Sequence, residues 1–303
     1  MSDIASLNSR FAIPGAVSVV SSNGNLPAIH INKPGLCSGT IYLHGAHVTA
    51  WKPEGAEEVL WLSQKSGWQN DKPIRGGVPL CFPWFGPRNS TEYPNSPMHG
   101  FARTKPWSIE SISESPTSIT VSLSLQNDAS TMALWPVPFM LRHRITFSRE
   151  LIMSLEFTHA AKTPIPFEEA QHTYFAVGDV REVKISGLSG ARYIDKTDNF
   201  NEKDQAGDVT ISAETDRVYL NTTSAITISD PVKRRRINIQ KENADATVVW
   251  NPWIAKAKAM PDFGDEEWPH MLCVETANAG PNAVNLAPNQ PHVMATRIAV
   301  SPL

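Results

Sequence analysis

The sequence predicts an all-β protein, a large antiparallel β-sandwich with short helical connectors. Apolar and polar residues alternate with a period of two in many short runs, and Gly, Pro, Asn and Asp fill the intervals between the runs. A half-buried antiparallel strand gives this alternation because successive side chains point to opposite faces of the sheet. The intervening residues are those that form turns. Helical periodicity is scarce, and we find no alternating β–α rhythm, internal repeat or low-complexity linker, so we expect one domain spanning residues 1–303.

The clearest strand is predicted at residues 118–125, SITVSLSL, where isoleucine, valine and leucine share one face and serine and threonine the other. Residues 151–159, LIMSLEFTH, repeat the pattern. Shorter alternating runs follow at 182–187, 225–229, 236–240, 246–250 and 295–300. The segments DASTMALWP and WIAKAKAM have room for two helical turns each and end near a proline, so they are predicted as the helical connectors.

The composition is that of a globular protein. Of the 303 residues, 41% are hydrophobic and 19% charged, and the net charge of -3 gives no overall attraction to nucleic acid or anionic lipid. The chain shows neither a secretory signal pattern nor an apolar run of the ~18 residues that a membrane-spanning helix needs. Cys37, Cys81 and Cys273 are widely spaced among apolar neighbours, which is typical of reduced, buried thiols. We therefore expect a cytoplasmic protein.

Proline and glycine concentrate in residues 72–103, KPIRGGVPLCFPWFGPRNSTEYPNSPMHGFAR. This stretch is too apolar for a disordered linker and too interrupted for strands. A long, ordered loop that carries aromatic side chains on a β scaffold is a common position for a functional site. We expect the site to use this loop.

Three short motifs are better explained without a metal-binding or nucleic-acid-binding role. His44 and His47 of HGAH are three apart, so in a strand they point to opposite faces and do not share a metal. The triplet DFG at 262–264 is similar to a kinase metal-binding triplet, but no glycine-rich loop accompanies it, so we interpret it as chance. The basic run KRRR at 233–236 adjoins an alternating strand, which favours a solvated strand end or turn over a nucleic-acid patch.

Six polar residues stand in positions that suggest a site: Arg75, His99, Arg103, His172, Asp216 and Glu275. Glu275 is the most informative, because it follows an apolar run typical of a buried strand and carboxylates are almost never buried unless they are paired or used. His172 precedes Tyr174 and Phe175, which we expect to fix its ring and exclude bulk water. A buried glutamate and histidine that share one cleft perturb each other's pKa values, as an acid–base pair does.

Taken one at a time, several of these residues have a simpler explanation. Considered by itself, His172 is better explained as a core histidine whose hydrogen bonds are formed within the protein, and Asp216 as a structural turn residue. Each loop arginine fits a salt bridge as well as a ligand clamp. The case for a site therefore depends on the motifs as a set.

Six motifs in chain order resemble those of the hexose-6-phosphate mutarotases, also called glucose-6-phosphate 1-epimerases: IRGGVPLCFPWFGP, MHGFAR, HTYFAVGD, ETDRVYLN, VVWNPW and CVETA. These enzymes are a branch of the aldose 1-epimerase, or galactose mutarotase-like, superfamily. The resemblance runs from about Tyr42 to the C-terminus. Each motif alone is weak evidence for the family, whereas six motifs in the same order are strong evidence. It implies a galactose mutarotase-like β-supersandwich with the site on one concave face.

The resemblance also implies residue roles. His172 in HTYF corresponds to the general acid, and Glu275 in CVETA to the general base. Arg75 in RGG and Arg103 in HGFAR correspond to substrate-contacting arginines, whose planar guanidinium suits a phosphate.

Three further positions are assigned on the same basis. Asp216 in TDRVY corresponds to a substrate-binding carboxylate. His99 matches a histidine that helps to hold the ring-oxygen side of the sugar in the galactose branch. Met98 departs from the pattern, because some relatives carry a polar residue there, and one sugar hydroxyl contact is missing as a result.

The expected function is that of a cofactor-free isomerase that interconverts the α and β anomers of hexose 6-phosphates, glucose 6-phosphate above all. An acid and a base suffice for ring opening and closure, so no metal or nucleotide is implied. Histidine suits the acid because its pKa, about 6.5, lies near working pH and an adjacent anion raises it. The expected partner is a small sugar phosphate, with no nucleic acid, membrane or obligatory protein partner. The alternatives are an epimerase of unphosphorylated aldoses and a non-catalytic sugar-phosphate-binding module.

Overall fold

The computed structural model describes residues 3–88, 91 and 96–303 and confirms the predicted all-β fold. Within these ranges the helices are short: α1 Ile4–Phe11, α2 Ala129–Leu134 and α3 Trp253–Ala259, with 3-10 helices at Asn23–Asn25, Ala102–Thr104, Trp268–His270 and Gly280–Asn282. None of them is long and apolar enough to cross a membrane. The helices α2 and α3 are the two predicted connectors. The sequence pattern did not predict α1, which buries only Leu7 and begins at the N-cap Asp3.

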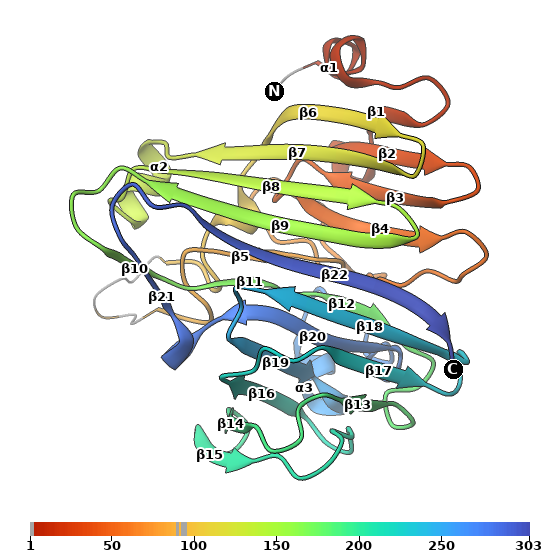
Figure 1. Cartoon of the computed structure of the whole chain (residues 1–303), viewed down its shortest axis with the longest axis vertical. Helices are drawn as coiled ribbons and strands as arrows, with labels where there is room; N and C mark the ends of the chain where they lie inside the picture. The colour runs from red at the N-terminus through yellow and green to blue at the C-terminus, as the bar shows by residue number, and fades with distance from the viewer. Residues whose placement is uncertain (1–2, 89–90, 92–95) are drawn as a thin grey trace.

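The first layer of the sandwich is an antiparallel sheet that, among the described residues, has eight strands in the order β13-β17-β18-β22-β9-β8-β7-β6 (Figure 1). Its strands are β6 Ser108–Ser115, β7 Ser118–Gln126, β8 Phe139–Phe147, β9 Glu150–His159, β13 Lys184–Ser186, β17 Ile226–Asp230, β18 Arg235–Glu242 and β22 His292–Pro302. The last strand, β22, lies between β9 and β18 and so joins the earlier and later parts of the chain in one sheet.

The alternation that predicted these strands is the reason that the layer buries one face. Val121, Ile145 and Met153 are cross-strand neighbours on β7, β8 and β9, and all three are fully buried. The next row, Ser122 and Arg144, points to the opposite face.

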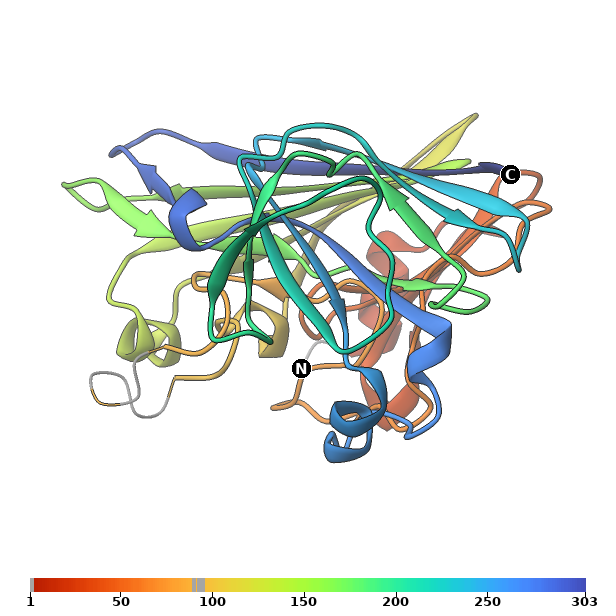
Figure 2. The ribbon, with the colours of Figure 1, turned by 90° about the horizontal axis from the view of Figure 1, so that it is seen from below.

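The second layer contains a sheet in the order β15-β14-β16-β19-β20-β11-β5, with β12 also pairing with β20. Its strands are β5 Leu80–Cys81, β11 Glu169–Gln171, β12 Tyr174–Ala176, β14 Arg192–Asp195, β15 Asn201–Asp204, β16 Thr215–Leu220, β19 Ala246–Asn251 and β20 Met271–Asn278. A separate sheet has the strands β1 Val17–Ser21, β2 Pro27–Lys33, β3 Cys37–Tyr42 and β4 His47–Pro53, and a ribbon pairs β10 Ile165–Phe167 with β21 Val284–Leu286. Figure 2 shows the first layer as a continuous sheet with the other strands and α3 to one side of it.

The predicted loop of residues 72–103 is irregular over its described part, apart from β5 and the 3-10 helix that begins at Ala102. It lies at one edge of the second layer, since β5 is the edge strand and pairs with β11. The loop therefore lies beside β11, the strand that precedes His172, and one strand away from β20, which carries Glu275.

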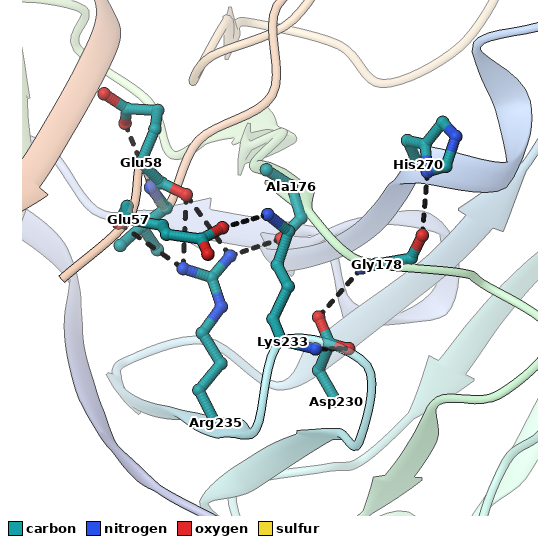
Figure 3. Close-up of polar contacts among 9 residues, drawn as sticks. Glu57, Glu58, Ala176, Gly178, Asp230, Lys233, Arg235 and His270 are labelled. Atoms are coloured by element: carbon teal, nitrogen blue, oxygen red, sulfur yellow. Dashed lines mark hydrogen bonds and ion pairs between the residues drawn. The ribbon is translucent and has the colours of Figure 1, made fainter.

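The KRRR run covers the end of the turn between β17 and β18 and the first two residues of β18, and it is only partly solvated. Arg235 is 5% exposed, and its guanidinium donates hydrogen bonds to the backbone carbonyls of Glu57, Glu58 and Ala176 (Figure 3). Lys233 forms an ion pair with Glu57 in the same view. The expectation of a solvated strand end or turn was thus wrong for Arg235, because its guanidinium donates to partly buried backbone carbonyls.

Candidate active site

A cleft with a volume of about 590 Å³ opens on one face of the second layer. Five of the six predicted site residues line it. Its lining includes Arg75, Phe85, Met98, His99, His172, Tyr174, Lys196, Asp216, Trp250, Lys256 and Glu275. The sheet explains the arrangement. Glu275 on β20 is the cross-strand neighbour of Val248 on β19, and Val248 is in turn the cross-strand neighbour of Val218 on β16. All three line the cleft, so alternate residues of these strands face it.

His172 lies in the short connection between β11 and β12, where its backbone N–H donates to the carbonyl of Pro79. Its ring stacks on that of Tyr174, with centroids 4.8 Å apart and planes at 9°, and meets the edge of Trp250. The aromatic wall beside His172 therefore consists of Tyr174 and Trp250, whereas Tyr174 and Phe175 were predicted. Phe175 does not contribute, because it points to the opposite side of β12 and is fully buried away from the cleft lining.

Glu275 lies in the middle of β20 and is 1% exposed. Its Oε1 is 3.3 Å from Nδ1 of His172. Neither carboxylate oxygen, nor this imidazole nitrogen, has a hydrogen-bond partner among the described residues. Two buried groups with unused hydrogen-bonding capacity beside a cleft are typical of groups that act on a ligand.

The electrostatics differ from the sequence-based expectation. Burial, reinforced by the positive charges of Arg103 and Arg75, lowers the pKa of His172 well below its ordinary value. Burial raises the pKa of Glu275 well above its ordinary value, although Lys196 opposes this effect. The expectation that the neighbouring anion raises the histidine pKa is wrong, because loss of hydration outweighs the carboxylate. Burial therefore disfavours the charged form of both groups.

Arg75 reaches the cleft from the loop that follows β4. Glycine is required at the next two positions: a Cβ on Gly76 would lie 2.4 Å from the carbonyl oxygen of Trp61, and both Gly76 and Gly77 have positive φ. The guanidinium of Arg75 donates to the Tyr174 hydroxyl at 2.9 Å and forms an ion pair with Asp262. The DFG triplet interpreted as chance therefore supplies the carboxylate that holds this arginine.

Arg103 and His99 stand close to the acid–base pair in different ways. Arg103 is buried, donates to the carbonyl of Met98 at 2.7 Å, and is absent from the cleft lining as far as the described residues show. The His99 ring meets the edge of the His172 ring at 5.6 Å, and its Nδ1 accepts from the backbone N–H of Gly86. Burial lowers the pKa of His99 well below its ordinary value, so it is a neutral ring.

Asp216 on β16 lines the cleft together with two lysines that the sequence did not single out. Lys196, just after β14, has its Nζ 3.5 Å from Oδ1 of Asp216 and 4.7 Å from the Phe85 ring centroid. Lys256 on α3 pairs with Glu214 at 3.0 Å. Burial raises the pKa of Asp216, against the effect of both lysines. No local pattern marks these lysines, because only the chain's folding brings the end of β14 and α3 to one cleft.

His44 and His47 both contact the backbone of the loop. His47 opens β4, and His44 stands in the turn before it. Nε2 of each ring lies 2.7 Å from a backbone carbonyl oxygen, that of Lys72 for His44 and that of Gly76 for His47. They hold the segment that presents Arg75.

A β-sandwich whose concave face carries a buried histidine and glutamate side by side, with aromatic and cationic residues around them, defines an isomerase of the mutarotase type. The sequence matches the family model "Aldose 1-epimerase" over residues 27–299, so the chain belongs to the aldose 1-epimerase family.

Individual relatives agree with this assignment. A protein of Cenchrus ciliaris named "Putative glucose-6-phosphate 1-epimerase" is 38% identical over 254 residues, 80% of this chain and 75% of its own length. A protein of Escherichia coli K12 with the same name is 38% identical over 238 residues, 78% of each chain. A crystal structure titled as a "putative mutarotase" from Salmonella typhimurium superposes with a TM-score of 0.89 at 32% identity, covering 97% of this chain and 96% of the other.

Proposed function

We propose that this protein interconverts the α and β anomers of hexose 6-phosphates, with glucose 6-phosphate as the first substrate to test. The observation that carries the proposal is the 3.3 Å approach of His172 Nδ1 and Glu275 Oε1 within a cleft of sugar size. The names of the relatives from Cenchrus ciliaris and Escherichia coli support the phosphorylated substrate.

The proposed reaction needs two proton transfers and consumes nothing. Glu275 takes the proton of the C1 hydroxyl while His172 gives a proton to the ring oxygen, and the bond between C1 and the ring oxygen breaks to form the aldehyde. Rotation about C1–C2 presents the other aldehyde face. Ring closure then returns the first proton from Glu275 to the C1 oxygen and the second from the ring-oxygen hydroxyl to His172. Each transfer contributes ~10²–10⁴-fold to the rate.

The pKa directions suit the open-chain stage of this cycle. Ring opening converts an imidazolium and a carboxylate into a neutral imidazole and a carboxylic acid. Burial lowers the pKa of His172 and raises that of Glu275, which favours this neutral pair. The environment therefore supports formation of the aldehyde. Contacts with the sugar oxygens must support the charged pair that begins the cycle, because Arg103 and Arg75 oppose the imidazolium.

The phosphate of the substrate is assigned to the cationic side of the cleft. Arg75, Lys196 and Lys256 line the cleft and carry the positive charge there, and Asp216 offers a carboxylate to a sugar hydroxyl. In this proposal His99 supports the ring-oxygen side. Arg103 acts from behind the lining, through its charge and its bond to the Met98 carbonyl.

We also propose that the chain is a single cytoplasmic domain. One cluster of buried apolar residues extends from Leu7 to Ile298, which supports one domain. The three cysteines are free and buried, as expected for a reducing compartment.

The test is anomer exchange of glucose 6-phosphate measured by NMR magnetisation transfer. Wild-type protein is expected to accelerate exchange, and His172→Ala or Glu275→Gln to return it to the uncatalysed rate. His30→Ala removes an exposed histidine on β2 and should leave the rate unchanged. Wild-type activity in either cleft variant overturns the assignment.

Arg75→Ala separates phosphorylated from free sugars. Because a charged hydrogen-bonding partner of the phosphate is lost, the rate on glucose 6-phosphate should fall far more than the rate on glucose or galactose. Equal losses on all three sugars would instead support an epimerase of unphosphorylated aldoses. Tight binding of glucose 6-phosphate without any accelerated exchange would support a binding module.

A further inference from the structure

Cys273 shares the cleft face with the acid–base pair. It stands two residues before Glu275 on β20, so both side chains point to the same side of the sheet. Its cross-strand neighbours, Trp250 on β19 and Tyr174 on β12, both line the cleft. The thiol therefore lies in the row next to Glu275, within 4.8 Å of a His172 ring nitrogen, and the proton-transfer steps make no use of it.

One ligand atom from each of His172, Cys273 and Glu275 lies within 4.8 Å of the other two. In a tetrahedral zinc site, nitrogen and oxygen ligands at ~2.0–2.1 Å from the ion are about 3.3 Å apart. The separation of His172 Nδ1 and Glu275 Oε1 is 3.3 Å. Sulfur at ~2.3 Å from the same ion would stand about 3.5 Å from the nitrogen, which is compatible with a thiol within 4.8 Å of both other ligand atoms.

The ligand atoms are also unused. His172 Nδ1 and both oxygens of Glu275 are buried and have no hydrogen-bond partner in the described part of the chain. The two residues are 7% and 1% exposed. Buried polar atoms without partners are costly, and a cation would satisfy the imidazole nitrogen and the nearer carboxylate oxygen together.

From this geometry we propose that His172, Cys273 and Glu275 bind a soft divalent cation, Zn²⁺ in the first instance, and that the bound ion inhibits the enzyme. Imidazole, thiolate and carboxylate are the donor types that zinc prefers, and three protein ligands leave a fourth position open to the cleft. Binding replaces the thiol proton and any proton on Glu275, which pass to solvent. Thiolate and carboxylate together neutralise the ion, which offsets repulsion from Arg75 and Arg103.

Inhibition follows because the ion holds both proton-transfer groups. A coordinated imidazole nitrogen and a coordinated carboxylate cannot exchange protons with a sugar. The inhibitory consequence rests on the proposed function, whereas the metal site itself does not. Substrate and ion compete for the same groups, so saturating glucose 6-phosphate should protect against Zn²⁺.

The first measurement is Zn²⁺ inhibition of anomer exchange, with each variant compared with its own metal-free rate. Wild-type protein should bind one ion and recover when the ion is chelated. Cys273→Ala should raise the inhibitory Zn²⁺ concentration by at least the ~10–100-fold that loss of an outer-shell partner costs. Cys37→Ala removes a buried thiol on β3, outside the site, and should behave as wild type. Equal inhibition of wild type and Cys273→Ala overturns the proposal.

The second measurement needs no activity. Co²⁺ added to the protein should give a thiolate-to-cobalt charge-transfer absorption that persists in Cys37→Ala and is absent in both Cys273→Ala and the size-matched Cys273→Ser. An absent band in wild-type protein overturns the site. A Cys273-dependent band in a protein that does not exchange anomers leaves the site standing and refutes the proposed function instead.

Discussion

Arg75 and Asp262 stand 187 positions apart in the sequence, yet Nη2 of the arginine is 3.1 Å from Oδ2 of the aspartate at the side of the cleft. Nε of Arg75 reaches the same oxygen at 3.2 Å, and Nη1 donates to the Tyr174 hydroxyl. Arg75 is thus fixed from two directions while its side chain stays one-fifth exposed to the cleft. Asp262 is a positioning residue for Arg75.

Asp262→Asn should weaken phosphate recognition and spare the chemistry. Asparagine keeps an oxygen beside Arg75 but removes the charge that orients the guanidinium. We expect KM for glucose 6-phosphate to rise about tenfold, ~1.4 kcal/mol, with little change in kcat and none in activity on free glucose.

The matched control for this change is Asp265→Asn. Asp265 belongs to the same segment and pairs with Lys65, with both side chains about half exposed. Its removal should leave KM unchanged. A fall in kcat with unchanged KM in Asp262→Asn would contradict the positioning role.

Lys256 lines the cleft from α3 and is expected to contact the substrate phosphate. Lys256→Ala should raise KM for glucose 6-phosphate about tenfold, because a charge-assisted hydrogen bond worth ~1.5 kcal/mol is lost. The measurement is KM at low and high salt, since the effect of a 40% exposed side chain should shrink as salt screens it.

Lys258→Ala serves as the comparison, because Lys258 is an exposed lysine of the same helix that does not line the cleft. It should have no effect on KM at either salt concentration. Equal changes in the two variants would show that α3 contributes only a general positive field.

The sequence predicted what depends on local order and on motifs. The period-two runs of β7 and β9 predicted strands that bury alternate residues, because a sheet imposes that period wherever one face meets the core. The motifs led to His172 and Glu275, and the structure brings these two together.

What the sequence could not predict depends on contacts between distant segments. Lys196 follows a strand and Lys256 lies on a short helix, so each alone is an ordinary surface lysine. Asp262 pairs with an arginine of a different loop, and no local period encodes that pairing. The pKa directions were missed for a related reason, since the burial that sets them arises only when β12 packs against β20.

Arg235 ties the β17–β18 turn to the strand that follows His172 (Figure 3). Arg235→Met should lower the free energy of unfolding by about 2–4 kcal/mol, because it removes the guanidinium that donates to the partly buried carbonyls of Glu58 and Ala176. Urea unfolding gives the value. Arg236→Met is the control, since Arg236 is exposed and donates only to Pro302 within the described residues. Equal effects of the two variants would contradict the anchoring role.

His143 makes stability depend on pH. The side chain is fully buried on β8 with Nδ1 3.2 Å from the carbonyl oxygen of Ala46, and burial lowers its pKa to about 4. In the unfolded chain the same ring takes up a proton near its ordinary pKa of about 6.5. Between these two values the unfolded state binds more protons, so the stability of the folded state falls as the pH falls.

His143→Gln removes this contribution while it keeps a donor for Ala46. The stability advantage of wild type over the variant should be constant above about pH 6.5 and shrink by about 2–3 kcal/mol on lowering the pH to 4. Urea unfolding at pH 7, 5.5 and 4 measures the change, and His30→Gln, an exposed substitution, should show no such trend. Because carboxylates also destabilise the fold in acid, only the difference between wild type and variant isolates the ring. A constant difference from pH 7 to 4 would mean that the His143 ring titrates with the same pKa in the folded and unfolded states, and that its burial does not keep the imidazole neutral.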